Sequence, residues 1–229
     1  MTELVHERTE PRVIALQLGP IGTNCYIVHA AGQAQAVVID PGADADQVVA
    51  TLEERSLEPV AILITHCHWD HLGGVADLAE RCSLPVYMSG QESHVLADLD
   101  RFAPADFGPW RSWTVDHALE GSESLSLAGL TFRVLELPGH SPHHLGFLID
   151  GIDEDAELDG VPPILFSGDV LFAGSVGRTD LPGSDHDTLM RTLARMLTVL
   201  DNNTLILSGH GAPTTIGQER HSNPFLAGL

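Results

Sequence analysis

The feature that most constrains this chain is the segment T-H-C-H-W-D-H at residues 65–71, which is rich in potential metal ligands. It ends the apolar run PVAILIT (59–65), which is typical of a strand covered on both faces. His66 and His68 are two positions apart just past this extended run, so both imidazoles can project to one side. Asp70 and His71 follow where the chain is expected to turn into a helix, and they aim at a neighbouring point. The segment therefore predicts metal binding at a strand end, with room for two ions.

Three more potential ligands follow apolar runs elsewhere in the chain. They are His140 in LPGHSPHH, Asp169 in FSGD and His210 in LSGHG, and each has a glycine directly before it. Imidazole and carboxylate suit zinc, iron or manganese, and the lack of thiolate ligands argues against a closed structural zinc site. One such histidine alone would be an ordinary polar residue, but three in the same setting favour a shared metal centre.

Strand and helix patterns alternate along both halves of the chain. Strands are expected at 12–18, 24–30, 36–40, 59–65, 85–88, 145–150, 164–172 and 204–211, with a hairpin at 124–137. Helices are expected at 43–56, 72–82, 185–200 and 218–225. The irregular stretch 89–113 suggests short helices forming a wall or lid, and 151–163 an acidic surface loop. This order predicts an α/β (α+β) sandwich of two sheets with outer helices.

Composition narrows the classes of function. The 229 residues fit one domain spanning 1–229, and 43% of them are hydrophobic. The net charge of −21, from 32 acidic residues against 11 arginines and no lysine, disfavours nucleic acid and anionic membranes as partners. Neither a membrane-spanning run nor a secretory signal is visible, so we expect a cytoplasmic protein. Three cysteines without a C-x-x-C pair make a disulfide framework improbable.

The motif H-x-H-x-D-H, followed by separate His, Asp and His residues at strand ends, resembles the metallo-β-lactamase-fold hydrolases. The resemblance extends from GPIGTNCY through VVIDPG to GRTDLPG and GHGAPTT. Within that superfamily the chain is most similar to the glyoxalase II-like thioester hydrolases (hydroxyacylglutathione hydrolases), particularly the short bacterial type. The resemblance implies a four-layer αβ/βα sandwich with a binuclear site, most often zinc, on one edge.

Carried over by position, the resemblance implies a first metal held by His66, His68 and His140. It implies a second metal held by Asp70, His71 and His210, with Asp169 bridging the two. Two close divalent cations lower the pKa of a shared water and polarise a carbonyl, so a small-molecule thioester could be hydrolysed without a side-chain nucleophile. Asp70 is then expected to orient the water. An aspartate at 169, where β-lactamases of the fold commonly have cysteine, argues against antibiotic hydrolysis.

Three further residues are expected around the centre. Asp40, in VVIDPG, resembles the family's buried aspartate that supports the ligand loop, although a turn-forming role is nearly as plausible. His144 is expected either to cover the site, where it would contact substrate, or to form a hydrogen bond nearby. Arg178, in GRTD, is the best candidate to bind a substrate carboxylate, the alternative being an ion pair with Asp180 or Asp185.

Several alternatives remain open at this stage. Only 19 residues follow His210, so we expect no C-terminal helical thiol-binding domain, and the carrier thiol is then either glutathione or another small thiol. A rival enzyme is a persulfide dioxygenase of the same fold, with one iron held by His66, His140 and Asp169. A non-catalytic metal-binding module is a third reading. The metal, the acyl group and the choice between a monomer and a small homo-oligomer are not determined by the sequence.

Overall fold

Two six-stranded sheets form the centre of the protein, whose computed structural model describes residues 10–151 and 160–229. The first sheet has the order β1-β2-β3-β4-β5-β6: Pro11–Leu18, Thr23–Ala30, Gln35–Ile39, Glu58–Leu63, Val86–Ser89 and His117–Leu119. The second has the order β14-β13-β10-β9-β8-β7: Thr214–Thr215, Leu205–Ser208, Ile164–Gly168, Leu145–Ile149, Leu130–Glu136 and Ser124–Leu127. Strands β11 (Leu171–Phe172) and β12 (Ser175–Val176) form a separate small hairpin.

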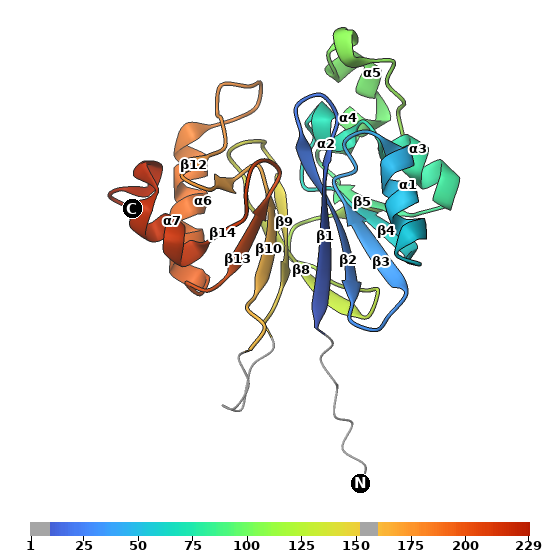
Figure 1. Ribbon diagram of the computed structural model, residues 1–229. Helices are drawn as coiled ribbons and strands as arrows, with labels where there is room; N and C mark the ends of the chain where they lie inside the picture. Colours follow the sequence, from blue (N-terminus) through green and yellow to red (C-terminus); the bar gives the residue numbers. More distant parts are fainter. Residues whose placement is uncertain (1–9, 152–159) are drawn as a thin grey trace.

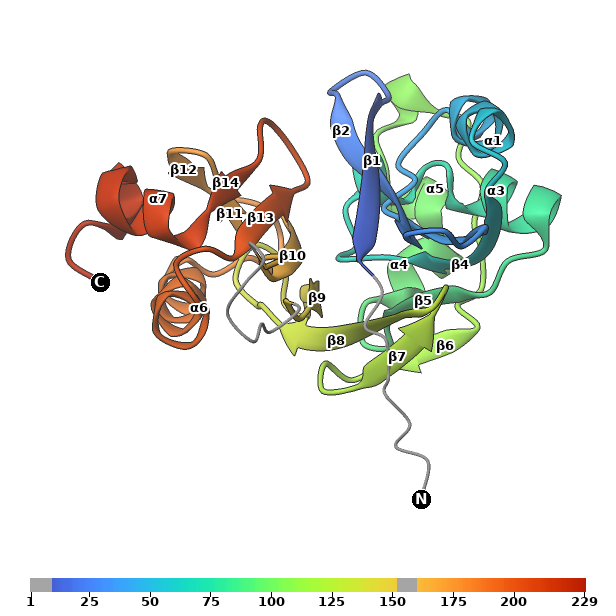
Figure 2. The same cartoon turned by 60° about the horizontal axis from the view of Figure 1, so that its bottom comes forward.

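Helices cover the outer face of each sheet. Helices α1 (Ala45–Glu54) and α3 (Val75–Cys82) lie on the first sheet, and α6 (His186–Val199) and α7 (Ile216–Ser222) lie on the second (Figures 1 and 2). The chain closes with the short helix η2 (Pro224–Leu226). This arrangement has the two sheets and outer helices predicted from the alternation of elements, and it is the four-layer αβ/βα sandwich that the resemblance implied.

Strands buried on both faces explain the continuous apolar runs in the sequence. In β4, Ile62 faces the helix layer and Leu63 faces the second sheet. In β10, Phe166 faces the first sheet and Leu165 faces α6. Because alternate side chains point to opposite faces, consecutive residues such as 61–64 and 164–166 are all apolar and buried, and each large buried side chain contributes about 1.5–3 kcal/mol.

The helix expected at 72–82 is in fact two helices. Helix α2 (Trp69–Leu72) begins inside the histidine segment, and α3 begins after Gly73 and Gly74. A Cβ atom on Gly74 would lie 2.5 Å from the carbonyl oxygen of Pro41, so the loop after β3 can approach only because a glycine is present. The break depends on this close tertiary contact, and the helical pattern of the sequence does not reveal it.

The strand expected at 164–172 also divides. Strand β10 ends at Gly168, where the register with β13 shifts and the backbone takes a φ of 49°. The following residues leave the sheet and pair with β12 instead of continuing β10. Asp169 therefore lies at the edge of the sheet and not within a strand.

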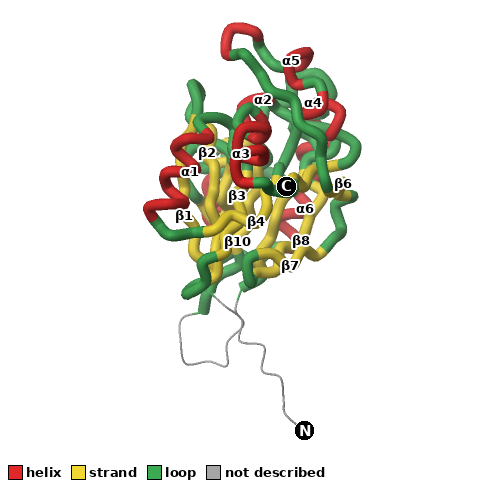
Figure 3. The backbone as a smooth tube through the Cα atoms, turned by 90° about the vertical axis from the view of Figure 1, so that its right-hand side faces the viewer, coloured by secondary structure: helices red, strands yellow, loops and turns green. Residues whose placement is uncertain are grey.

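Short helices replace regular structure between β5 and β6, as expected for 89–113. They are α4 (Ser93–Ala97), α5 (Leu99–Phe102) and η1 (Ala105–Phe107), and α4 and α5 lie beyond the strand ends in Figure 3. Most of the expected acidic loop lies outside the described residues, at 152–159. Among the helices of the described ranges, none has the length and apolar character needed to cross a bilayer.

Candidate metal centre

The expected ligand residues meet at one edge of the sandwich. Strand β4 leads into the histidine segment, β10 leads to Asp169, β13 leads to His210, and the loop after β8 carries His140. Because β10 and β13 run parallel, their carboxyl ends lie at the same edge. The structure thus brings all seven residues together from both halves of the chain.

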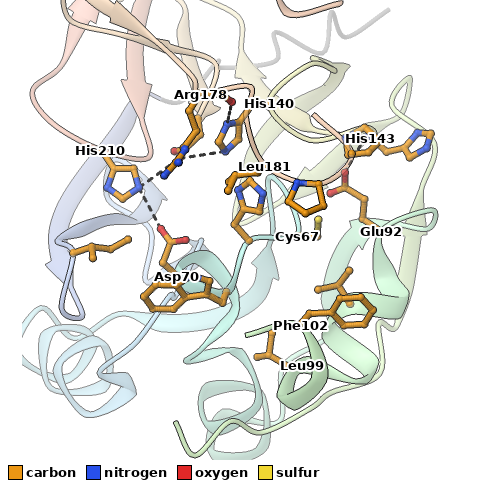
Figure 4. Close-up of a pocket in the computed structure, with 18 of the residues that line it drawn as sticks. Cys67, Asp70, Glu92, Leu99, Phe102, His140, His143, Arg178, Leu181 and His210 are labelled. Atoms are coloured by element: carbon orange, nitrogen blue, oxygen red, sulfur yellow. Dashed lines mark hydrogen bonds and ion pairs between the residues drawn. The ribbon is translucent and has the colours of Figure 1, made fainter. Parts of the chain in front are cut away.

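The first group consists of three imidazoles. Nε2 of His66 lies 3.0 Å from Nδ1 of His68, and the His66 and His140 rings are 4.9 Å apart. Nδ1 of His140 lies 2.8 Å from the carbonyl oxygen of Arg178, to which it donates (Figure 4). Since one nitrogen of His140 is used in this way, the other is free to face the group. One ligand atom from each of the three residues lies within 4.8 Å of the others, which is close enough to share an ion.

The second group combines a carboxylate with two imidazoles. Oδ2 of Asp70 lies 3.3 Å from Nε2 of His71. The same oxygen lies 3.2 Å from Nε2 of His210 (Figure 4). The hydroxyl of Thr23 donates to the same oxygen at 2.9 Å. These ligand atoms also lie within 4.8 Å of one another.

Asp169 lies between the two groups. Its Oδ1 is 3.4 Å from Nε2 of His71, and its Oδ2 is 3.5 Å from Nε2 of both His140 and His210. A side chain at Gly209 would overlap Asp169, because an added Cβ would collide with Oδ1. The glycine before His210 therefore makes room for the carboxylate that contacts both groups.

The two groups differ in charge. Burial and the neighbouring imidazoles lower the pKa of His66 well below its usual value and that of His68 to about 4, so both rings are neutral at pH 7. Burial also opposes protonation of His71 and His210, but carboxylates outweigh it. For His71 the largest of these opposing effects is the charge of Asp169, and its pKa rises well above its usual value. For His210 the largest is the hydrogen bond to Asp169, and its pKa rises to about 9.

Unpartnered buried atoms test whether metal ions fit this centre. Among the described residues, Nε2 of His71, Nε2 of His140 and Oδ1 of Asp169 are buried and have no hydrogen-bond partner. Each such atom costs about 1–3 kcal/mol, and all three point toward the shared ligand groups. A set of imidazoles and carboxylates suits zinc, iron or manganese. The residues therefore fit divalent ions.

Asp40 contacts the ligand loop from behind. Its carboxylate accepts hydrogen bonds from the backbone N–H of Thr65 at 2.8 Å and from the Thr65 hydroxyl at 2.7 Å. Its Oδ2 also lies 2.9 Å from Nδ1 of His71, which directs the other ring nitrogen toward the metal groups. These contacts match the supporting position expected for Asp40.

His144 forms a hydrogen bond beside the ligands, which is the second of the two roles expected for it, and it does not line the cavity described below, so a substrate contact is not supported. Its side chain is fully buried, and its ring stacks on that of His66 at 4.6 Å. Its Nε2 accepts the backbone N–H of Asp169 at 3.1 Å. The residue is behind the ligands because it directly precedes β9, whose residues are all buried.

Arg178 lies at the cavity and is paired with Asp180. Its Nε and Nη2 donate to the two carboxylate oxygens of Asp180, each at 2.7 Å. Both side chains are exposed, so this pair is a weak surface interaction. The alternative that the sequence left open, an ion pair with Asp180, is therefore present in the structure.

A cavity of about 1140 Å³ lies over the ligand groups. Its lining includes His68, Asp70, His140, Asp169 and His210. Glu92, which sequence analysis missed, also lines it: the carboxylate is 2% exposed and accepts the backbone N–H of His143 at 2.8 Å (Figure 4). No pattern in the sequence marks Glu92, because this contact joins residues 51 positions apart.

Known proteins share this chain's family. The model of the metallo-beta-lactamase superfamily matches residues 18–154. This chain belongs to that superfamily. A probable metallo-hydrolase, YqgX of Bacillus subtilis, is 35% identical, and the match covers 93% of this chain and 97% of that protein. The hydroxyacylglutathione hydrolase GloC of Haemophilus influenzae is 34% identical, and the match covers 89% of this chain and 92% of that protein.

Solved structures of the metallo-β-lactamase superfamily agree with the fold. BLEG-1, described as a B3 metallo-beta-lactamase, is 38% identical with a TM-score of 0.82, and the match covers 95% of this chain and all of that one. TTHA1623, solved in a di-iron-bound form, is 39% identical with a TM-score of 0.78, and the match covers 93% of this chain and 100% of that one. ETHE1 from Myxococcus xanthus is 25% identical with a TM-score of 0.76, and the match covers 95% of this chain and 85% of that one.

Proposed function

We propose that the protein is a binuclear metal-dependent hydrolase that cleaves a small-molecule thioester. The observation that carries this proposal is the pair of ligand groups, joined by Asp169, at the floor of a large cavity. His66, His68 and His140 would hold one divalent ion, and Asp70, His71 and His210 the other. Zinc is the first candidate. Iron is the second, supported by the relative in di-iron form, and manganese also suits these ligands.

Bound divalent ions supply Lewis acidity, which polarises a carbonyl and makes a coordinated water more acidic. The chain's own residues supply the rest. Asp70 is held by contacts with Thr23 and His210. Burial alone would raise its pKa, but the nearby imidazoles outweigh burial and lower the pKa to about 2, so Asp70 remains a carboxylate. It can therefore accept a hydrogen bond from the attacking water and orient it. Water adds to the thioester carbonyl, the C–S bond breaks, and a carboxylic acid and a thiol leave.

No side chain competes with water as the nucleophile. The sequence contains no G-x-S-x-G elbow. Burial, followed by the charge of Glu92, raises the pKa of the Cys67 thiol well above its usual value, so this cysteine is an unreactive thiol. It also belongs to neither ligand group.

The relatives named hydroxyacylglutathione hydrolases support a hydroxyacyl thioester as the substrate. We leave the carrier open between glutathione and another small thiol, because Arg178, the one arginine that lines the cavity within the described ranges, is already paired with Asp180.

A substrate panel tests the proposal. Protein loaded in turn with zinc, iron and manganese would be assayed with one hydroxyacyl group on several thiols, with release of the thiol as the signal. Hydrolysis by the loaded protein, and its loss on chelation, is the expected result. A loaded, folded protein inert toward every thioester would overturn the proposal. A β-lactam belongs in the panel too, because a neighbour 38% identical to this chain is described as a B3 metallo-beta-lactamase.

The second candidate is a persulfide dioxygenase with one iron at His66, His140 and Asp169. It is favoured by the 3.5 Å approach of Nε2 of His140 to Oδ2 of Asp169, which lets these residues share an ion. Oxygen uptake with a glutathione persulfide, measured on the same iron-loaded sample, separates the two functions. Consumption of oxygen without thioester cleavage would establish the dioxygenase.

A further inference from the structure

One side of the cavity is built from apolar side chains that the proposed chemistry does not use. This apolar side consists of Trp69, Val95, Leu99, Phe102 and Pro104. They come from α2, α4, α5 and the loop that follows. Figure 4 shows Leu99 and Phe102 across the cavity from Arg178 and His140.

The apolar side is held rigidly by an aromatic cluster. Trp69 stacks on Phe107 with ring centres 5.0 Å apart and contacts Trp110 edge to face at 5.4 Å. The indole N–H of Trp110 donates to the carbonyl oxygen of Pro104 at 2.8 Å. A surface fixed in this way loses little conformational freedom when a ligand binds, which favours affinity.

One side chain of the apolar side, and one in the aromatic cluster behind it, are unusually exposed for their type. Phe102 is 47% exposed, and Phe107, which backs Trp69, is 48% exposed. Leu99 and Val95 lie beneath them and are buried. Large apolar side chains gathered at the mouth of a cavity mark a binding site more often than scattered ones do.

A charged group distinguishes the side of the cavity opposite Phe102. That side contains Arg178 with its partner Asp180 and Ser175 of β12, beside the apolar Phe172, Val176 and Leu181. The thiol carrier of a biological thioester is its polar part, so it matches that side. The acyl group then points toward the apolar side, with the scissile bond over the ligand groups between them.

We propose that the apolar side is a binding site for an aliphatic acyl chain, so that the enzyme prefers thioesters whose acyl group, hydroxylated or not, carries a medium-length chain to those with a short one. This inference rests on the proposed function, since it assigns the acyl part of that substrate. Buried methylenes gain free energy in proportion to apolar area, and preference should therefore grow with chain length until the apolar side is filled.

A chain-length series tests the inference. Acetyl, butanoyl, hexanoyl and octanoyl thioesters of one neutral thiol, N-acetylcysteamine, would be compared by kcat/KM. We expect a rise of up to about fourfold per added methylene, the value for complete burial. Phe102→Ala should flatten this rise while leaving the acetyl thioester nearly unchanged, and Phe102→Leu should restore most of it.

Phe225→Ala is the matched control, because Phe225 is 50% exposed but does not line the cavity. Its chain-length profile should equal that of the unmodified protein. A flat profile in the unmodified protein, or an equal loss for all chain lengths in Phe102→Ala, would overturn the inference and leave thioester hydrolysis standing.

Binding of non-hydrolysable S-alkyl thioethers, measured by calorimetry, separates this inference from the proposed function. Affinity that rises with alkyl length, with an increasingly negative heat-capacity change, supports the apolar site even if no thioester is cleaved. Equal binding of short and long thioethers would refute it whatever the activity.

Discussion

Oδ2 of Asp40 lies 2.9 Å from Nδ1 of His71, a buried contact that joins the end of β3 to the ligand segment after β4. The carboxylate fixes which nitrogen of His71 carries the proton and leaves Nε2 facing Asp70 and Asp169. An imidazole held in this way is a more basic and better-directed metal ligand. The contact therefore links the fold of the first sheet to the second ligand group.

Replacing Asp40 by Asn should weaken metal binding about 10- to 100-fold at the group that contains His71. Asp40 has a φ of 51°, a conformation that asparagine also adopts, so the backbone should be preserved. Competition with a chromophoric chelator measures the affinity. Asp44→Asn is the control, since Asp44 shares the left-handed backbone but is exposed. Equal affinities in the two variants would contradict the role given to Asp40.

Removing His210 should cost the protein one bound ion. Its Nε2 contacts Asp70 and Asp169, and the group of His66, His68 and His140 does not depend on it. Elemental analysis of His210→Ala should therefore find one ion fewer per chain than in the unmodified protein. His94→Ala, which alters a cavity histidine outside the ligand groups, should retain the full metal content. Full occupancy in His210→Ala would refute the assignment.

Metal binding should release protons from one group and not from the other. In the metal-free protein the pKa of His210 is raised to about 9 and that of His71 also lies above neutrality, so both rings hold a proton at pH 7 that an ion must displace. The pKa of His68 is lowered to about 4 and that of His66 is lowered well below its usual value, so their group binds without proton release.

Affinity for one ion should accordingly rise between about pH 5 and 8 and affinity for the other should stay nearly constant. Calorimetric titrations in buffers of different ionisation enthalpy count the protons released at each step. Two binding steps with the same proton count would be inconsistent with the charge difference between the groups.

Freeing Arg178 should improve binding of anionic thioesters. In Asp180→Asn the guanidinium loses its charged partner, so KM for a substrate with a carboxylate in its thiol part should fall several-fold while kcat changes little. Arg178→Ala should raise the same KM. A neutral thioester serves as the comparison, and unchanged KM values for the anionic one in both variants would remove Arg178 from substrate recognition.

Local patterns predicted much of this molecule. The ligand residues at 66–71 lie within one short segment, and the remaining ligands each follow an apolar strand, so the sequence shows both features directly. The hairpin about Ala128 and Gly129 was also predictable from a local pattern, a glycine between two strand-like stretches. In the structure both residues take the positive φ of a tight turn.

Long-range contacts account for what was missed. Glu92 reaches His143 across the interface between the two sheets, and the break before α3 depends on Pro41 approaching Gly74. The burial of His144 beneath His66 likewise follows from how β9 packs. Spacing along the chain contains no information on such contacts.

Trp69 lies between two ligand residues in sequence, and its indole is stacked within the aromatic cluster on the cavity wall. Any ion drawn to His68 or Asp70 changes the electric field around this ring, and any aliphatic guest covers one of its faces. The chain thus contains an intrinsic fluorophore at a position where loading and occupancy can both be followed by emission, without an added dye.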